Sequence, residues 1–219
     1  MIPDYERAAL AATETLIAHG ISAAPVMAMP IIKQMPGVIA LSFTEMADQH
    51  GLDRKTMIPM FGASNQDAIT FVKDFKGELR YLVAYNQRLP YYMLQRALAR
   101  ELGHIVLRHD GSRPEAVRAE EALCFARYLL FPRALIHAIQ EAGVSFTVES
   151  FGNITGCYGR CLAGLRKTPG AHIPREMNRE IRVNFSAYIE NYLDFYLFSR
   201  ADDDSALADF GTFMENYEE

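Results

Sequence analysis

The sequence predicts an α+β fold in which a small, mostly antiparallel sheet packs against helices. Two β-rich runs, at residues 68–75 and 79–85, are separated only by Lys76-Gly77-Glu78. Segments with helical periodicity precede and follow these runs, and half of the 219 residues are apolar. An antiparallel hairpin covered by amphipathic helices accounts for both patterns.

Shorter elements are expected before the hairpin. Residues 4–19 place apolar side chains on one helical face, and Gly20 ends that helix. The stretch 25–36 is rich in proline and methionine, which indicates a short helix between turns. Residues 38–43 favour a strand, and residues 44–50 favour a short helix.

Three helices are expected after the hairpin. The first begins at Pro90 and runs to about residue 108. The second covers 114–131 and stops at Pro132, and the third covers 132–142. The first two provide long apolar faces that can cover one side of the sheet.

The C-terminal part is expected to be mainly helical. Residues 174–198 favour helix, although the alternation from Ile181 to Phe185 also allows a strand. The acidic end of the chain is most simply a solvated terminal helix and tail. We therefore expect two parts, a sheet-containing domain at residues 1–145 and a helical extension packed on it at 146–219.

Composition argues against a general nucleic-acid binder, because the net charge is −5. Residues 151–167 allow a DNA-reading helix-turn-helix with Arg160, Arg166 and Lys167 on it. The basic cluster is small, so a packing role is favoured for this segment. A regulator that acts on DNA stays open as a weaker alternative.

The chain shows no sign of a membrane or secretory segment. The N-terminal residues lack the pattern of a signal peptide, and no apolar stretch approaches the roughly 20 residues that span a bilayer. Three cysteines, Cys124, Cys157 and Cys161, make an odd number without a disulfide pattern. Their spacing allows a metal site, but core packing is favoured. We expect a cytoplasmic protein.

The segment that carries the chemistry runs from Arg100 through Glu-Leu-Gly to His104. It matches the zinc-binding pattern H-E-x-x-H at every position except the first. In that pattern two histidines lie one helical turn apart and bind Zn²⁺, and the glutamate between them activates the metal-bound water. Glu101 and His104 keep these places, whereas the guanidinium of Arg100 stays protonated and cannot act as a ligand.

The next predicted helix supplies a candidate third ligand. Glu120 and Glu121 both lie on it, and two-histidine zinc sites take a glutamate as their third ligand. Glu121 is the favoured residue and Glu120 is the alternative.

These motifs together resemble the ImmA/IrrE family of zincin-type metallopeptidases. The matching residues are Asn86, Leu89-Pro90, Ala99 to His104 and Glu121 to Pro132. The similarity is strongest over 80–132 and weak after 145. It implies a zincin-like fold and a cytoplasmic regulatory protease of a kind that relieves a transcriptional repressor, often in mobile elements or stress responses. By position, it implies that Glu101 is the general base and that His104 and Glu121 are metal ligands.

Arg100 breaks the family pattern and leaves the metal open. In the favoured hypothesis, Arg100 takes the place of zinc as a structural cation among Glu101 and Glu121, and Glu120 is left open as a further neighbour. Zinc is then absent, and the protein is a pseudo-peptidase that binds a protein or peptide partner such as a repressor. A third possibility is a decayed site filled by solvent.

The alternative hypothesis is an active zinc metallo-endopeptidase that cleaves a repressor with a variant ligand set. Zinc would bind through His104, Glu121 and another ligand such as His109. Five residues separate the two histidines, which is poor geometry for one helical face, so a helix C-terminal role is favoured for His109. In either hypothesis we expect an edge strand at Tyr85 and Asn86 to hold an extended substrate or partner segment.

Overall fold

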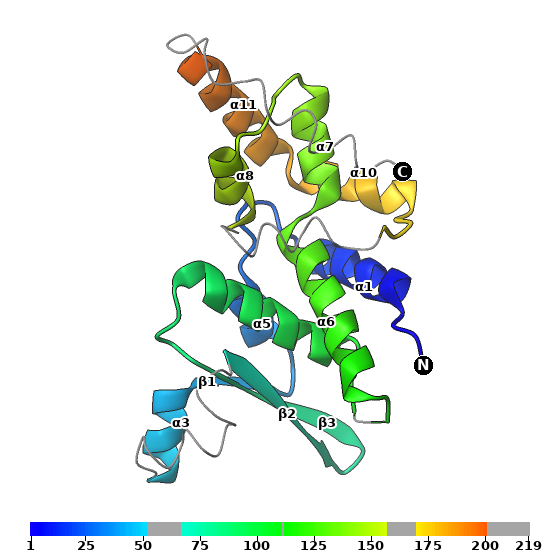
Figure 1. Cartoon of the computed structure of the whole chain (residues 1–219), viewed down its shortest axis with the longest axis vertical. Helices are drawn as coiled ribbons and strands as arrows, with labels where there is room; N and C mark the ends of the chain where they lie inside the picture. The colour runs from blue at the N-terminus through cyan, green and yellow to red at the C-terminus, as the bar shows by residue number, and fades with distance from the viewer. Residues whose placement is uncertain (52–66, 111, 157–169, 201–219) are drawn as a thin grey trace. The chain divides into compact units, whose positions relative to one another are not determined.

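The computed structural model describes residues 1–51, 67–110, 112–156 and 170–200. By their contacts the residues divide into two compact units (Figure 1). The first contains Met1–Asp4 and Met27–Ala126, and the second contains Tyr5–Val26 and Arg127–Glu219. All described strands lie in the first unit, so the predicted α+β class is confirmed as a mixed fold with a small sheet.

The first unit is built on a three-stranded sheet made of β1 (Val38–Ser42), β2 (Ala68–Phe75) and β3 (Glu78–Tyr85). β3 is the central strand: it pairs antiparallel with β2 over its full length and parallel with β1 from Tyr81 onward. The sheet is therefore mixed, and the expectation of a mostly antiparallel sheet is correct for only one of its two pairings.

The predicted hairpin between β2 and β3 is confirmed. Lys76 and Gly77 form its turn with φ angles of 57° and 85°, the left-handed conformations that a two-residue hairpin turn of this kind needs. The Asp74 carboxylate accepts the Gly77 N–H at 2.8 Å and closes the turn. The hairpin sequence thus fixes the register that places Thr70 beside the candidate site.

The central place of β3 corrects one prediction. Tyr85 pairs with Ser42 on one side and with Ala68 on the other, and the Asn86 N–H donates to the Asp67 carbonyl at 2.9 Å. The main chain at Tyr85 is already used on both sides, so an edge strand at Tyr85 and Asn86 is wrong. Among the described strands, β2 is the edge that lies beside the candidate site.

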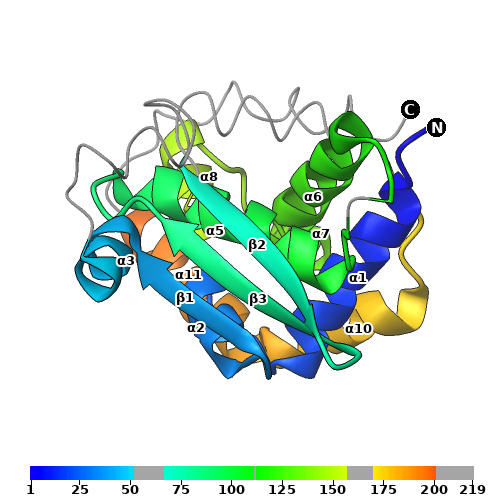
Figure 2. The same ribbon diagram turned by 90° about the horizontal axis from the view of Figure 1, so that it is seen from below.

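Helix α5 (Tyr91–Val106) begins directly after Pro90, as predicted, and packs on one face of the sheet, behind the strands in Figure 2. Leu98, Leu102 and Ile105 are buried on its apolar side. The preceding helices are α2 (Ala28–Gln34) and α3 (Phe43–His50). Ala47 of α3 is buried, and Phe43, Met46 and Ile69 pack against it.

Helix α6 (Glu115–Leu130) crosses α5 at Gly103. A β-carbon at Gly103 would lie 3.1 Å from the backbone of Ala122 and 3.1 Å from the Phe125 β-carbon. Glycine therefore permits the close approach of the two helices that carry the candidate site residues.

The described part of the second unit is helical. It contains α1 (Tyr5–Ala18), α7 (Arg133–Glu141), α8 (Val148–Thr155), α10 (Arg175–Asn184) and α11 (Ser186–Arg200). Its core includes Phe146, Phe151 and Phe185, all fully buried. Because Ile181 to Asn184 belong to α10, the alternative of a strand there is wrong.

The contact-based division differs from the predicted domain limits of 1–145 and 146–219. α1 and α7 group with the later helices, although both fall within 1–145. Contacts alone do not fix the limits of a domain, so those limits stay a prediction. Cys157, Cys161, the basic residues Arg160, Arg166 and Lys167, and the acidic C-terminal end lie outside the described residues.

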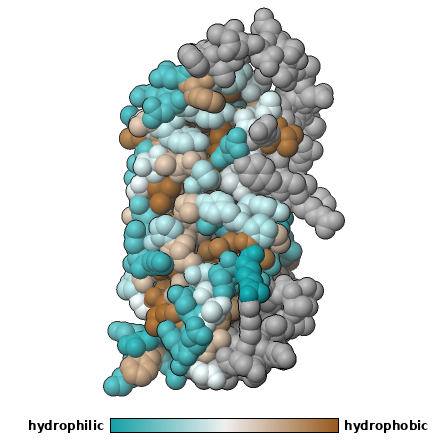
Figure 3. Space-filling model, turned by 90° about the vertical axis from the view of Figure 1, so that its left-hand side faces the viewer, coloured by the Kyte–Doolittle hydropathy of each residue, from teal (hydrophilic) through white to brown (hydrophobic). Residues whose placement is uncertain are grey.

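One stretch, Glu115–Glu141, is long and apolar enough to cross a membrane by composition, but 67% of its window is buried inside the fold. Burial of this extent is what a core helix of a globular protein shows. On the face drawn in Figure 3, hydrophobic and hydrophilic residues are interspersed in small areas. A cytoplasmic location stays a prediction.

Candidate functional site

The side chains of Arg100 and Glu101 lie together at the middle of the site. The Nε and Nη2 atoms of Arg100 donate to Glu101 Oε1 at 3.1 and 2.9 Å. Arg100 Nη2 also lies 3.3 Å from the carbonyl of Ala68 on β2. Of the glutamates expected around Arg100, only Glu101 is in contact with it, because Glu121 is paired with Arg113 instead. The Arg100–Glu101 pair connects α5 to the edge strand.

Glu101 is buried from solvent and held from two directions. Its second carboxylate oxygen accepts the hydroxyl of Thr70 at 2.9 Å, and only 4% of its side chain is exposed. Burial raises the pKa of Glu101 above its usual range, and the neighbouring Arg100 and Thr70 only partly offset this effect. Such a carboxyl group takes up a proton more readily than an exposed glutamate.

The C-terminal end of α5 turns back toward the site. The Arg108 N–H donates to the Ile105 carbonyl and the His109 N–H donates to the His104 carbonyl, both at 3.0 Å. These two bonds form a Schellman motif, and Arg108 occupies its left-handed position with φ of 52°. Glycine is usual there, so Arg108 is held in a conformation that its β-carbon disfavours.

This turn brings the His109 side chain against the His104 side chain. On a continuous helix, a spacing of five residues would place the two side chains on different faces. The two Nδ1 atoms are 2.9 Å apart, and His109 Nε2 lies 3.1 Å from Glu121 Oε2. A consistent assignment has neutral His104 donating from Nδ1 to His109, and His109 donating from Nε2 to the carboxylate. Burial, followed by the charges of His109, Arg100 and Arg118, lowers the pKa of His104 to about 4, in agreement with a neutral ring.

Glu121 is the end of this chain of hydrogen bonds and is almost fully buried. Besides His109, it accepts the main-chain N–H of Asp4 at 2.7 Å and is paired with Arg113 Nη1 at 2.7 Å. Only 1% of its side chain is exposed, whereas Glu120 is exposed on the same helix. Of the two candidates, Glu121 is the one that faces the site.

A pocket of about 440 Å³ lies along β2 and above these residues. Ala68, Thr70 and Val72 of the strand line one side, and Arg100, Glu101 and His104 line the other. The charged residues Asp110, Glu115 and Arg118 also line it. The pocket therefore borders both the β2 strand and the side chains of the candidate site.

The present arrangement does not fit a zinc ion. His109 turns one ring nitrogen to His104 and the other to Glu121, so the three side chains do not point to one centre. Each carboxylate is bonded to an arginine, Glu101 to Arg100 and Glu121 to Arg113. Within the part of the chain that the structure describes, no group of three or more His, Cys, Asp or Glu side chains is placed to hold a metal.

Residues 49–156 match the family model of the IrrE N-terminal-like domain, a peptidase family. This segment includes Arg100, Glu101, His104 and Glu121, and it supports a metallopeptidase-type fold. No curated protein and no solved structure matches the chain. The match agrees with the family resemblance found in the sequence, and it does not test whether Arg100 replaces a ligand.

Sequence reasoning missed three partners in the site: Thr70, Arg113 and the Asp4 main chain. Arg113 lies in the loop before α6, outside any helical periodicity, and Asp4 is distant in sequence from its partner Glu121. Thr70 lies on the α5-facing side of β2, and its alternation with Phe71 is the one signal that marks it.

Proposed function

We propose that this protein is a metal-free pseudo-peptidase that binds an extended segment of a regulatory protein, such as a transcriptional repressor. The observation that carries the proposal is the contact of two Arg100 nitrogens with one carboxylate oxygen of Glu101. The carboxylate in the position of a general base is engaged by a cation in the position of a metal ligand. A hydrolytic water activated by Glu101 would have to compete with that cation.

The binding half of the proposal is supported by the edge strand. Among the described strands β2 pairs only with β3, and its other edge borders the pocket that contains Arg100 and His104. An extended peptide can add to such an edge through main-chain hydrogen bonds, with its side chains reaching into the pocket. Loss of catalysis does not remove this mode of binding.

One observation favours the alternative, a zinc metallo-endopeptidase with a variant ligand set. His109 lies within 3.1 Å of a nitrogen or oxygen of both His104 and Glu121, so the three potential ligands are contiguous. A metal site would require the His109 ring to turn and the Arg113 side chain to leave Glu121. The two functions therefore differ in a measurable quantity, the metal content of the protein.

The test is the zinc content of the wild type, measured by elemental mass spectrometry on protein purified without chelator. We expect no zinc in the wild type and a gain of zinc in Arg100→His, where a ligand replaces the guanidinium. Arg96→His is the matched control, because Arg96 is exposed on the same helix and lines neither pocket.

Near-stoichiometric zinc in the wild type would overturn the pseudo-peptidase and turn the search to a cleavable substrate. Zinc in Arg100→His but not in Arg96→His would show a metal site blocked by Arg100. Absence of zinc from both variants would mean that Arg113 and His109 also prevent metal binding, and the triple change Arg100→His with Arg113→Gln and His109→Ala would then test that point.

A further inference from the structure

The sheet has a second face, which is turned toward the reader in Figure 2 while α5 lies behind the strands. Thr70 bonds to Glu101 of α5, so its neighbour Phe71 points to this second face. Cross-strand partners share a face, which adds Leu82 of β3 and Ile39 of β1. Phe71, Leu82 and Ile39 therefore form one row across the three strands.

This row is apolar and accessible. Ile39 is 60% exposed and Phe71 is 40% exposed, although side chains of this kind are mostly buried in folded proteins. Ile69 lies two residues before Phe71 on the same face, and it packs against the buried Ala47 of α3. An apolar surface that continues from a packed cluster into solvent is typical of a place that a partner covers.

A pair of like charges lies beside the apolar row. Lys73 of β2 is directly opposite Arg80 of β3, so both cations share the face of Phe71 and Leu82. Like charges in opposed positions destabilise a sheet, and in the described part of the chain neither cation is in an ion pair. Arg80 lies over the Phe75 ring, 4.4 Å from its centroid. We call the surface formed by the two rows the outer face of the sheet: Ile39, Phe71, Lys73, Arg80 and Leu82.

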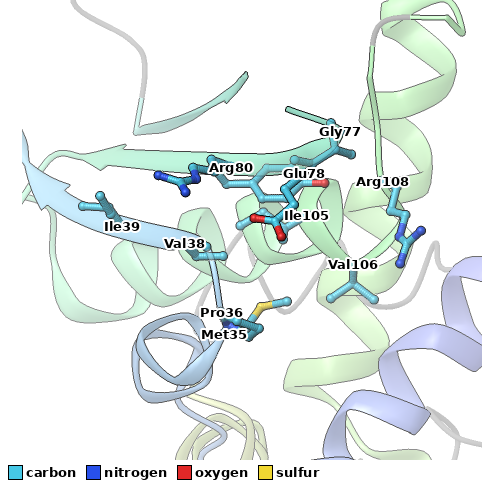
Figure 4. A pocket seen from close by; sticks show the side chains of 13 residues that line it. Met35, Pro36, Val38, Ile39, Gly77, Glu78, Arg80, Ile105, Val106 and Arg108 are labelled. Carbon is cyan, nitrogen blue, oxygen red and sulfur yellow. The ribbon is translucent and has the colours of Figure 1, made fainter. Parts of the chain in front are cut away.

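Figure 4 shows Arg80 from the other side of the sheet, at a pocket of about 960 Å³ beside the end of α5. Ile105 and Val106 line this pocket, and Arg80 points away from them. The charge of Arg80 therefore belongs to the outer face and not to the apolar hollow beside α5.

The two rows favour a ligand that is both apolar and acidic. Cations without a carboxylate partner favour carboxylate groups, and on the strands only Glu78 adds a negative charge to the face that carries Lys73 and Arg80. The strands use their main chain within the plane of the sheet, so a segment lying on the face must satisfy its own main-chain groups. A helix does so, and a helix on a sheet is the layer that α5 already forms on the other side.

A single-stranded nucleic acid fits the outer face less well. Bases stack on aromatic rings, but Ile39 and Leu82 have none, and the guanidinium of Arg80 already lies over the Phe75 ring. The net charge of −5 also disfavours the approach of a polyanion. The apolar row and the small number of cations therefore favour a protein segment.

We propose that the outer face of the sheet binds an amphipathic helix of a partner protein, in which carboxylates flank an apolar stripe. The stripe covers Ile39, Phe71 and Leu82, and the carboxylates pair with Lys73 and Arg80. This binding goes beyond the proposed function, because it uses neither the pocket along β2 nor the metal content of the protein. Its failure would leave the proposed function untouched.

The test uses the full chain and a dye-labelled helical peptide of about 15 residues, which makes four helical turns. Leucine recurs in it every three or four residues, and glutamate flanks the leucine stripe; a second peptide has glutamine in place of each glutamate. Fluorescence anisotropy should show that the wild type binds the glutamate peptide about fivefold more tightly, the effect of two exposed ion pairs. Binding should also shift the methyl NMR signals of Ile39 and Leu82.

Two changes separate the charged row from the apolar row. Lys73→Gln combined with Arg80→Gln should abolish the preference for glutamate. The unfolding temperature should stay near that of the wild type, because relief of the like-charge pair offsets the lost contact with the Phe75 ring. Ile39→Ser should weaken the binding of both peptides by roughly tenfold, since an apolar contact is lost.

Matched controls come from exposed residues elsewhere in the chain. Arg96→Gln removes a cation from α5, and Val183→Ser removes an apolar side chain from α10 that is 64% exposed. Both variants should bind the two peptides as the wild type does.

Four results would overturn the inference. The first is equal binding of the two peptides, or no binding of either up to millimolar concentration. The second is a preference for glutamate that survives the change of both Lys73 and Arg80. The third is the absence of any shift in the Ile39 and Leu82 signals. The fourth is tighter binding of an oligothymidylate that displaces the peptide, which would assign the outer face to single-stranded nucleic acid.

Discussion

The two buried carboxylates of the site are neutralised in different ways. Glu101 on α5 relies on Arg100, its neighbour in sequence, whose side chain is 36% exposed. Glu121 on α6 is held by Arg113, His109 and the Asp4 N–H, all distant from it in sequence or outside its helix. The first arrangement depends on one local partner. The second depends on three donors, and its cation, Arg113, is less exposed than Arg100, at 24% against 36%. Removing Arg113 is therefore expected to cost more than removing Arg100.

The largest expected effect is that of Arg113→Ala. Removing this cation leaves the Glu121 carboxylate buried with two donors, and the free energy of unfolding should fall by about 2–4 kcal/mol. This expected loss is smaller than that for a fully buried ion pair, because 24% of the Arg113 side chain is exposed. Denaturant unfolding measures it.

Arg182→Ala is the control for that measurement. Arg182 forms a bidentate pair with Glu141 in the second unit, where the two side chains are 38% and 61% exposed. Such a pair should contribute less than about 1 kcal/mol. Equal losses from Arg113→Ala and Arg182→Ala would show that burial of Glu121 does not matter.

Gly103→Ala tests whether both carboxylates depend on the close approach of α5 and α6. The added methyl group meets the Ala122 backbone and the Phe125 β-carbon at 3.1 Å, and the backbone cannot turn away. We expect a loss of about 1–3 kcal/mol in thermal unfolding, the range for an overpacked core. A gain in stability, the usual result of Gly→Ala within a helix, would mean that the helices separate without cost.

Arg100→Ala should have a smaller effect than Arg113→Ala. Its guanidinium is partly in solvent, and the pKa of Glu101 is already raised, so this carboxyl can take up a proton and keep its bond to Thr70. A loss of about 1–2 kcal/mol is expected, between the values for exposed and buried pairs. A loss equal to that of Arg113→Ala would remove the distinction between the two carboxylates.

The elements of the site that depend on local pattern were predictable from the sequence. The hairpin, the start of α5 at Pro90 and the pairing of Arg100 with Glu101 each depend on residues close together in the chain. The central position of β3 was not predictable, because strand order depends on β1, which is separated from the hairpin by α3 and residues 52–66.

His109 shows why the remainder of the site escaped prediction. A spacing of five residues excludes a shared face only if the helix continues, and α5 ends at Val106. No glycine marks the end, because Arg108 takes the left-handed position that glycine usually has. The signal that ordinarily shows where a helix turns back is therefore missing from the sequence.

The smallest expected effect concerns this turn. Arg108→Gly and Arg108→Ala both remove the cation, but only the first removes the β-carbon that disfavours the left-handed conformation. The glycine variant should be more stable than the alanine variant by about 1 kcal/mol in denaturant unfolding. Because the turn places His109 against Glu121, the glycine variant should also keep the His109 ring signals of the wild type in NMR spectra. Equal stability of the two variants would mean that the turn does not strain residue 108.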